Sequence, residues 1–162
     1  MLQGSSCIFD MAKKTKSYSQ VTATDELEKL GQNGSSATDF VFELLRIFAG
    51  YGDGQIRRTK EGPGNLAKDG LTTLIKNLIA YRPASVNSIT GDCSGIYDVV
   101  NSMRDEPKIA KANPRLYVAS NGVHVVAYDP KENDWYENRV DLIWRDFEFF
   151  TPLAGIEKIQ YT

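Results

Sequence analysis

The strongest strand signal in the chain is the stretch RLYVASNGVHVVAYDP, which covers residues 115–130. Its β-branched and aromatic residues are typical of strands, and they form two runs on either side of Asn121-Gly122. Because Asn-Gly suits both central positions of a type I′ turn, the stretch predicts a β-hairpin closed by such a turn. A further strand is expected from Trp135 to Val140.

Another strand is expected in TTLIKNLIAYRPAS, residues 72–85. The spacing of its apolar residues leaves helix and strand open for this segment. Pro83 favours an extended conformation for the residue before it, so we expect a strand over the second half. This strand would end in an aromatic ring, a fixed positive charge and a chain breaker, namely Tyr81, Arg82 and Pro83.

Helices are expected before and after this strand. The segment 35–52 has one wide apolar stripe, with Ser36 as its cap and Gly50 at its end. The segment 95–114 has apolar residues at helical spacing and is expected to stop at Pro107. A short helix is predicted from Thr24 to Gly31. By contrast, the turn-rich stretch GQIRRTKEGPGNLAKDG, residues 54–70, is expected to form a β-hairpin.

Length and composition indicate one globular domain. The chain has 162 residues, of which 41% are hydrophobic and 25% are charged. The order of expected elements predicts an α/β (α+β) fold with a mixed β-sheet flanked by helices. We expect a flexible arm over residues 1–23 and a single domain over residues 24–162. Two distant cysteines and the absence of a long apolar run favour a cytoplasmic chain with no membrane contact.

Basic residues gather in two neighbouring segments and indicate local contact with DNA. The formal net charge of −2 gives no global attraction to nucleic acid, so a contact needs a local patch. Lysine and arginine at a sheet edge suit phosphate groups. The alternative is a solvated strand edge, where charge prevents aggregation. The candidate DNA-binding residues are Arg57, Arg58, Lys60, Lys68, Lys76 and Arg82.

Four segments resemble, in their order and spacing, the N-terminal region of type IIG-like restriction–modification class I DNA methyltransferases. They are ATDFVFELLRIFAG, GNLAKDGLTTLIKNLIAYRP, NPRLYVASNGVHVVAYDP and FEFFTPLAGIEK, and the resemblance covers about residues 36–160. In that family the region resembles a PD-(D/E)xK nuclease with an α-β-β-β-α-β core. It leads into a helical connector and an adenine-specific methyltransferase domain. The resemblance therefore implies that this chain ends where the connector would begin, and that S-adenosylmethionine is bound only by the parent protein.

The resemblance also implies where a nuclease site would lie. Such nucleases hold Mg²⁺ through an Asp and through the acid of an acid-x-Lys triplet, whose Lys orients the nucleophile. Asp69 falls at the position of the first Asp, Ala80-Tyr81-Arg82 falls on the triplet, and Glu43 matches an auxiliary acid. Ala80 cannot ligate a metal, and arginine differs in shape from lysine. The expected function is that of a degenerate, DNA-associating nuclease-like domain without a cofactor and with no assigned metal ligands.

Two alternatives remain open from the sequence. An active but atypical Mg²⁺-dependent endonuclease would need Glu61, Asp69 or Glu43 within metal-ligand distance of one another. A non-catalytic scaffolding domain would dock on the methyltransferase part of its parent, or form a homodimer, through an apolar patch in residues 147–156. If the chain is the degenerate nuclease-like domain, it is expected to be inactive by itself. Its parent would be a site-specific adenine-N6 DNA methyltransferase, with or without endonuclease activity.

Overall fold

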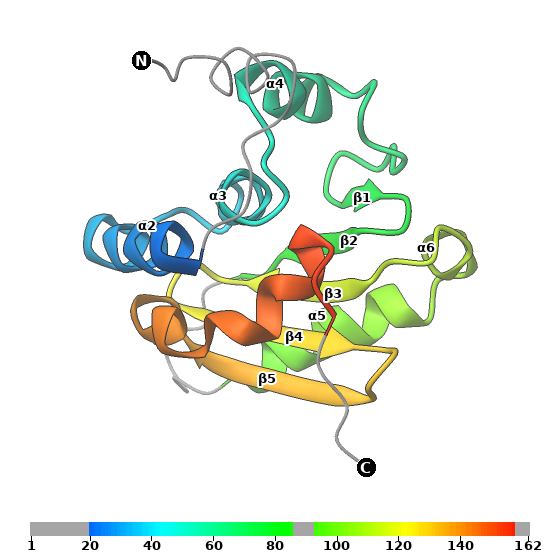
Figure 1. Cartoon of the computed structure of the whole chain (residues 1–162). Coiled ribbons are helices and arrows are strands. Elements are labelled where there is room, and N and C mark those ends of the chain that lie inside the picture. The colour runs from blue at the N-terminus through cyan, green and yellow to red at the C-terminus, as the bar shows by residue number, and fades with distance from the viewer. Residues whose placement is uncertain (1–19, 86–92, 158–162) are drawn as a thin grey trace.

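A computed structural model describes residues 20–85 and 93–157, which form a five-stranded mixed β-sheet with helices on both faces (Figure 1). The strands are β1 Thr73–Ile75, β2 Ile79–Pro83, β3 Leu116–Ser120, β4 His124–Asp129 and β5 Asp134–Arg139. They lie in the order β1-β2-β3-β4-β5. The β2–β3 pair is parallel and the other neighbours are antiparallel. The expected class, a mixed sheet flanked by helices, is confirmed.

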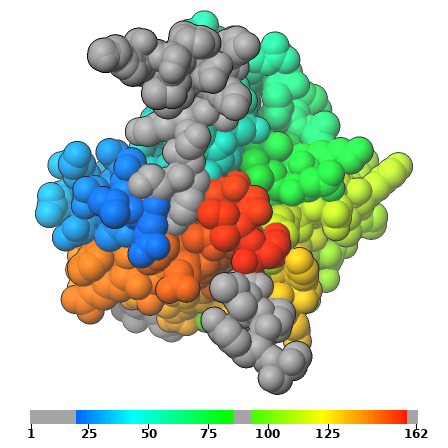
Figure 2. Space-filling view, viewed as in Figure 1, coloured from blue at the N-terminus to red at the C-terminus, as the bar shows by residue number. Residues whose placement is uncertain are grey.

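The helices form two layers. One face of the sheet is covered by α2 (Gln20–Asn33), by α3 (Phe40–Ile47) and by η1 (Val140–Ala154), a run of 3₁₀ turns. The other face is covered by α5 (Ser94–Arg104) and α6 (Pro107–Lys111). Figure 2 shows η1, in orange and red, beside α2, in blue. The apolar side chains of each layer pack on one face, so the sheet separates two hydrophobic clusters.

Strict alternation along β2 decides which side chains reach each layer. Ile79 and Tyr81 belong to the cluster under α2, α3 and η1, whereas Ala80 belongs to the cluster under α5 and α6. Because side chains alternate between faces, Arg82 lies on the same side as Ala80. A slip of one residue in register would exchange the two sets, so burial on both faces fixes the pairing.

The strands expected after residue 71 are present. The hairpin of β3 and β4 is confirmed, but its turn is not type I′, because Gly122 has a φ of 92° while Asn121 keeps an ordinary negative φ. Instead the Asn121 side chain accepts hydrogen bonds from the backbone N–H groups of Val123 (2.9 Å) and His124 (2.8 Å). In residues 72–85 the second half forms β2 as predicted, and the first half adds the antiparallel strand β1.

The β-hairpin predicted for residues 54–70 is wrong. Its first part is helix α4, Asp53–Glu61. The side chain of Gln55 accepts a hydrogen bond from the Gly52 N–H (3.1 Å) and so caps the first turn, while Ile56 and Thr59 are buried on one face. Consequently residues 20–85 contribute two strands before α5, whereas the α-β-β-β-α-β order has three.

The remaining helix predictions have mixed outcomes. The helix expected from Thr24 to Gly31 is longer in the structure and begins at Gln20, within the predicted arm, whose residues 1–19 lie outside the described part of the chain. The helix in segment 95–114 is confirmed as α5, and Pro107 then opens α6. None of the helices in residues 20–85 and 93–157 is long and apolar enough to cross a membrane.

The apolar patch expected in residues 147–156 does not form as a continuous surface. Phe149, Phe150 and Leu153 are buried in the core between η1 and the sheet. Phe147 is half-buried, and Ile156 is 46% exposed. Most of this aromatic segment therefore closes the hydrophobic core.

Candidate functional site

Arg82 is the centre of a hydrogen-bonded network at the end of β2. Its Nε donates to the Thr72 hydroxyl at 2.8 Å, and its Nη2 lies 2.7 Å from a Glu106 carboxylate oxygen and 3.6 Å from Asp69 Oδ2. The arginine side chain is 13% exposed. One guanidinium therefore joins the loop before β1, strand β2 and the residue that precedes α6.

Asp69 is held in place by the start of β1. Its Oδ1 accepts hydrogen bonds from the backbone N–H groups of Leu71 and Thr72, each at 2.8 Å, and its Oδ2 accepts one from the Thr72 hydroxyl at 2.8 Å. Partial burial acts to raise the pKa of Asp69, but these hydrogen bonds and the positive charge of Arg82 lower it overall. Asp69 is therefore an ionised partner for Arg82 near neutral pH.

Tyr81 points to the opposite face of the sheet. Its hydroxyl donates to the backbone carbonyl of Ala37, in the turn before α3, and burial raises the pKa of the phenol. The ring also packs against Phe40 with ring centroids 6.2 Å apart. Tyr81 thus links β2 to the layer that contains α3, while Arg82 links β2 to the residue before α6 on the other face.

The donor set around Arg82 does not match a Mg²⁺ site. Magnesium requires several oxygen ligands. Ala80 offers none and is fully buried, while Asp69 and Glu106 both face the guanidinium of Arg82. Across the part of the chain that the structure describes, no group of three or more His, Cys, Asp or Glu side chains is placed to hold a metal ion.

The structure separates the auxiliary acid from this network. Glu43 lies on α3, on the opposite face of the sheet from Arg82, and pairs with Arg46 at 2.6 Å. Glu61 ends α4. The convergence of Glu43, Glu61 and Asp69 that an atypical metal-dependent site would need is not found among the described residues.

The predicted DNA-binding residues lie in different settings. Arg57 and Arg58 are exposed on α4, where Lys60 lies over the Phe42 ring at 4.9 Å from its centroid. The Lys68 ammonium donates to the backbone carbonyls of Gly62 and Asn65 at 2.7 Å each, so it stabilises the loop in which it lies. The last two lie apart from α4: Lys76 is exposed at the β1–β2 turn, and Arg82 is held within the network.

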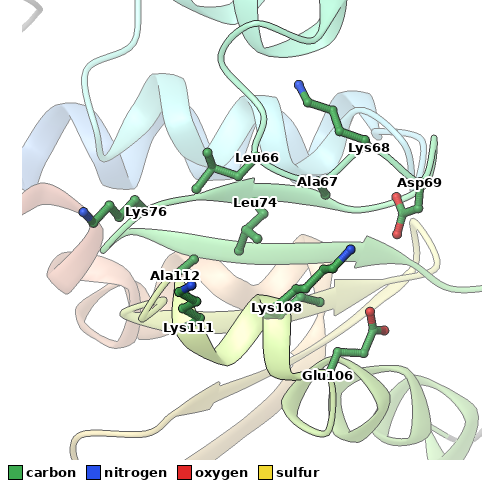
Figure 3. A pocket seen from close by; sticks show the side chains of 11 residues that line it. Leu66, Ala67, Lys68, Asp69, Leu74, Lys76, Glu106, Lys108, Lys111 and Ala112 are labelled. Carbon is green, nitrogen blue, oxygen red and sulfur yellow. The ribbon is translucent and has the colours of Figure 1, made fainter.

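A cavity of about 600 Å³ opens beside the network (Figure 3). It is lined by Leu66, Ala67, Lys68, Asp69, Leu74, Lys76, Glu106, Lys108, Ile109, Lys111 and Ala112. Sequence reasoning found three of the charged members but missed Glu106, Lys108 and Lys111. The signal for them in the sequence is Pro107, because proline favours the first position of a new helix as well as the end of the preceding one.

The chain is distantly similar to a DNA methyltransferase. It is 24% identical over 129 residues to DNA methyltransferase A of Bacillus subtilis (strain 168). The match covers 80% of this chain, and the chain spans 14% of the length of that relative. No family model matches, and no solved structure matches. The similarity indicates a relation to DNA methyltransferases.

Proposed function

We propose that this chain is the DNA-associating, nuclease-like domain of a restriction–modification DNA methyltransferase, and that it does not cleave DNA. The observation that carries the proposal is the network of Arg82. Where a nuclease of this type has an acid, a spacer and a lysine directed at Mg²⁺, β2 has Ala80 and an arginine paired with Asp69 and Glu106. The similarity to DNA methyltransferase A supports the methyltransferase context.

Within this proposal the network has a positioning role. Arg82 pairs with two carboxylates, Asp69 and Glu106, so it holds the β1 loop against the start of α6 instead of contacting phosphate. Phosphate contacts would come from exposed cations, such as Arg57 and Arg58 on α4. Methyl transfer to adenine, and S-adenosylmethionine, would belong to the methyltransferase part of the protein.

The first test is DNA cleavage. Purified chain is incubated with unmodified duplex DNA and Mg²⁺ or Mn²⁺, beside the variant Asp69→Ala. We expect no cleavage by either protein, because Ala80 offers no metal ligand and the carboxylates of Asp69 and Glu106 are both paired with Arg82. Cleavage by the unmodified chain that disappears in the variant would overturn the proposal in favour of an active, atypical endonuclease.

The second test is DNA association measured by fluorescence anisotropy over a range of salt concentrations. Arg57→Glu is expected to weaken binding to any duplex sequence and to reduce the slope of log K against log salt by about 0.9, the value for one phosphate contact. The matched control is Lys29→Glu on α2, whose side chain is 66% exposed and lies on a different helix. It should leave binding unchanged.

Absence of duplex binding by the unmodified chain would remove the DNA-associating part of the proposal. The scaffolding alternative would then be tested by binding of the chain to a separately expressed methyltransferase domain.

A further inference from the structure

The cavity beside Arg82 combines an apolar floor with a basic rim (Figure 3). Leu74, Ile109 and Ala112 are buried below it, and Leu66 lies at its edge. Its volume of about 600 Å³ is within the range of cavities that take small organic ligands. A ligand that used the whole cavity would therefore have both an apolar face and negative charge.

The charge at the mouth is positive although the chain as a whole is not. Lys108 and Lys111 project from α6, and Lys76 projects from the β1–β2 turn. Arg82 contacts both acids of the lining, Asp69 and Glu106, and offsets one of their two negative charges. Four lysines line the same cavity, so its charge stays positive: Lys68, Lys76, Lys108 and Lys111. In a chain of net charge −2, this mouth is a local attraction for anions.

Leu66 is exposed in a loop whose backbone is held by hydrogen bonds. The backbone N–H of Leu66 donates to Leu74 O at 2.9 Å. The side chain of the preceding residue, Asn65, forms three further hydrogen bonds with the backbone of the loop and of β1. Asn65 Nδ2 donates to Thr72 O (2.9 Å), and Oδ1 accepts from the N–H groups of Ala67 (3.0 Å) and Leu74 (2.8 Å). A leucine that is 55% exposed at the edge of a cavity contributes little to folding. It is well placed to contact a ligand.

We infer that this cavity takes one unpaired nucleotide of a DNA strand. The base would lie against Leu66, Leu74 and Ile109, and its flanking phosphates would meet Lys108 and Lys111. Apolar side chains contact the flat faces of unstacked bases, and lysines bind phosphates. A purely apolar ligand would leave the lysines unused, and a bare phosphate would leave the leucines unused. The inference rests on the proposed DNA association and assigns it a site.

The test compares two duplexes of the same sequence by fluorescence anisotropy, one fully paired and one with a single bulged adenosine. We expect the bulged duplex to bind up to about tenfold more tightly, the lower end of the gain for a base stacked on an aromatic ring, because aliphatic side chains line this cavity. Leu66→Ser should bring the ratio of the two affinities toward one. Leu71→Ser is the matched control, because Leu71 is 51% exposed in the same loop but does not line the cavity, so the ratio should be unchanged.

Three results would overturn the inference. Equal binding of the two duplexes would remove it while leaving the proposed DNA association intact. Binding of neither duplex would remove both. Competition by free deoxyadenosine monophosphate at the concentrations at which the bulged duplex binds would show that the cavity serves a small molecule instead of a DNA strand. Circular dichroism of each variant verifies that the fold is retained.

Discussion

The guanidinium of Arg82 contacts Thr72, Asp69 and Glu106 at once. Arg82→Ala should lower the free energy of unfolding by about 1–2 kcal/mol, because it removes charge-assisted hydrogen bonds whose acidic partners are only partly solvated. Arg82→Lys should recover less than half of that loss, since one ammonium cannot reproduce the planar set of donors. Urea unfolding monitored by circular dichroism measures both values.

The control at this scale is Arg139→Ala. Arg139 pairs with Asp141 at 2.7 Å, with side chains 58% and 40% exposed, so its removal should cost about 0.5 kcal/mol or less. An Arg82→Ala loss no larger than that of Arg139→Ala would contradict the central role of the network.

Helix α2 packs closely on η1 at one glycine. A Cβ added to Gly31 would lie 2.7 Å from the Cα of Asp141, a backbone atom that cannot move aside without shifting η1. Gly31→Ala should therefore destabilise the fold by about 1–3 kcal/mol, although alanine is the better helix former. The same substitution at Gly54, in the first turn of α4, meets nothing within 4 Å and should stabilise by about 0.5–1 kcal/mol. Thermal unfolding of both variants measures whether each substitution lowers or raises the stability of the fold. A change in the same direction for both would contradict this packing.

The error in predicting α4 has a physical cause. Glycine and proline in residues 54–70 read as turn signals, but Gly54 lies in the first helical turn, where its flexibility matters little. The helix is stabilised by contacts remote in sequence, because Ile56 packs into the cluster formed with α2, α3 and η1. Local propensity did not contain that information, and tertiary burial overrode it.

At the scale of the whole molecule, a second ionic network ties the end of the described chain to the sheet. Arg115, just before β3, contacts Asp129 at 2.5 Å and Glu157 at 2.6 Å, and Lys131 lies 3.2 Å from Glu157. Asp129 is fully buried at the end of β4. These contacts join the residue before β3, the end of β4, the β4–β5 turn and the segment that follows η1.

This network predicts a dependence of stability on pH. Hydrogen bonds from Arg115 and Lys131, together with their charges, lower the pKa of Glu157 from 4.5 to about 2. A lowered carboxyl pKa stabilises the folded chain above the unfolded value, and the contribution is lost as the pH falls from 4.5 to about 2. The stability difference between the unmodified chain and Glu157→Gln should thus be present at pH 6 and vanish near pH 2. Urea midpoints measure it, with exposed Glu148→Gln as the control. A difference that is constant over this range would exclude the linkage.

The sequence by itself determined the elements whose signals are local. The strands β3, β4 and β5 follow from β-branched and aromatic runs, β2 follows from the effect of Pro83 on the residue before it, and α3 and α5 follow from apolar stripes. Each of these signals lies within a dozen residues. Through a resemblance, the sequence also assigned Asp69 and Arg82 to positions of one candidate nuclease site. Only the tertiary structure decided that Arg82 bonds to Glu106 and that Glu43 lies on the other face of the sheet. Spacing along a strand shows which side chains share a face. Which helices cover that face depends on how β2, α3 and α6 pack against one another, and the spacing does not encode it.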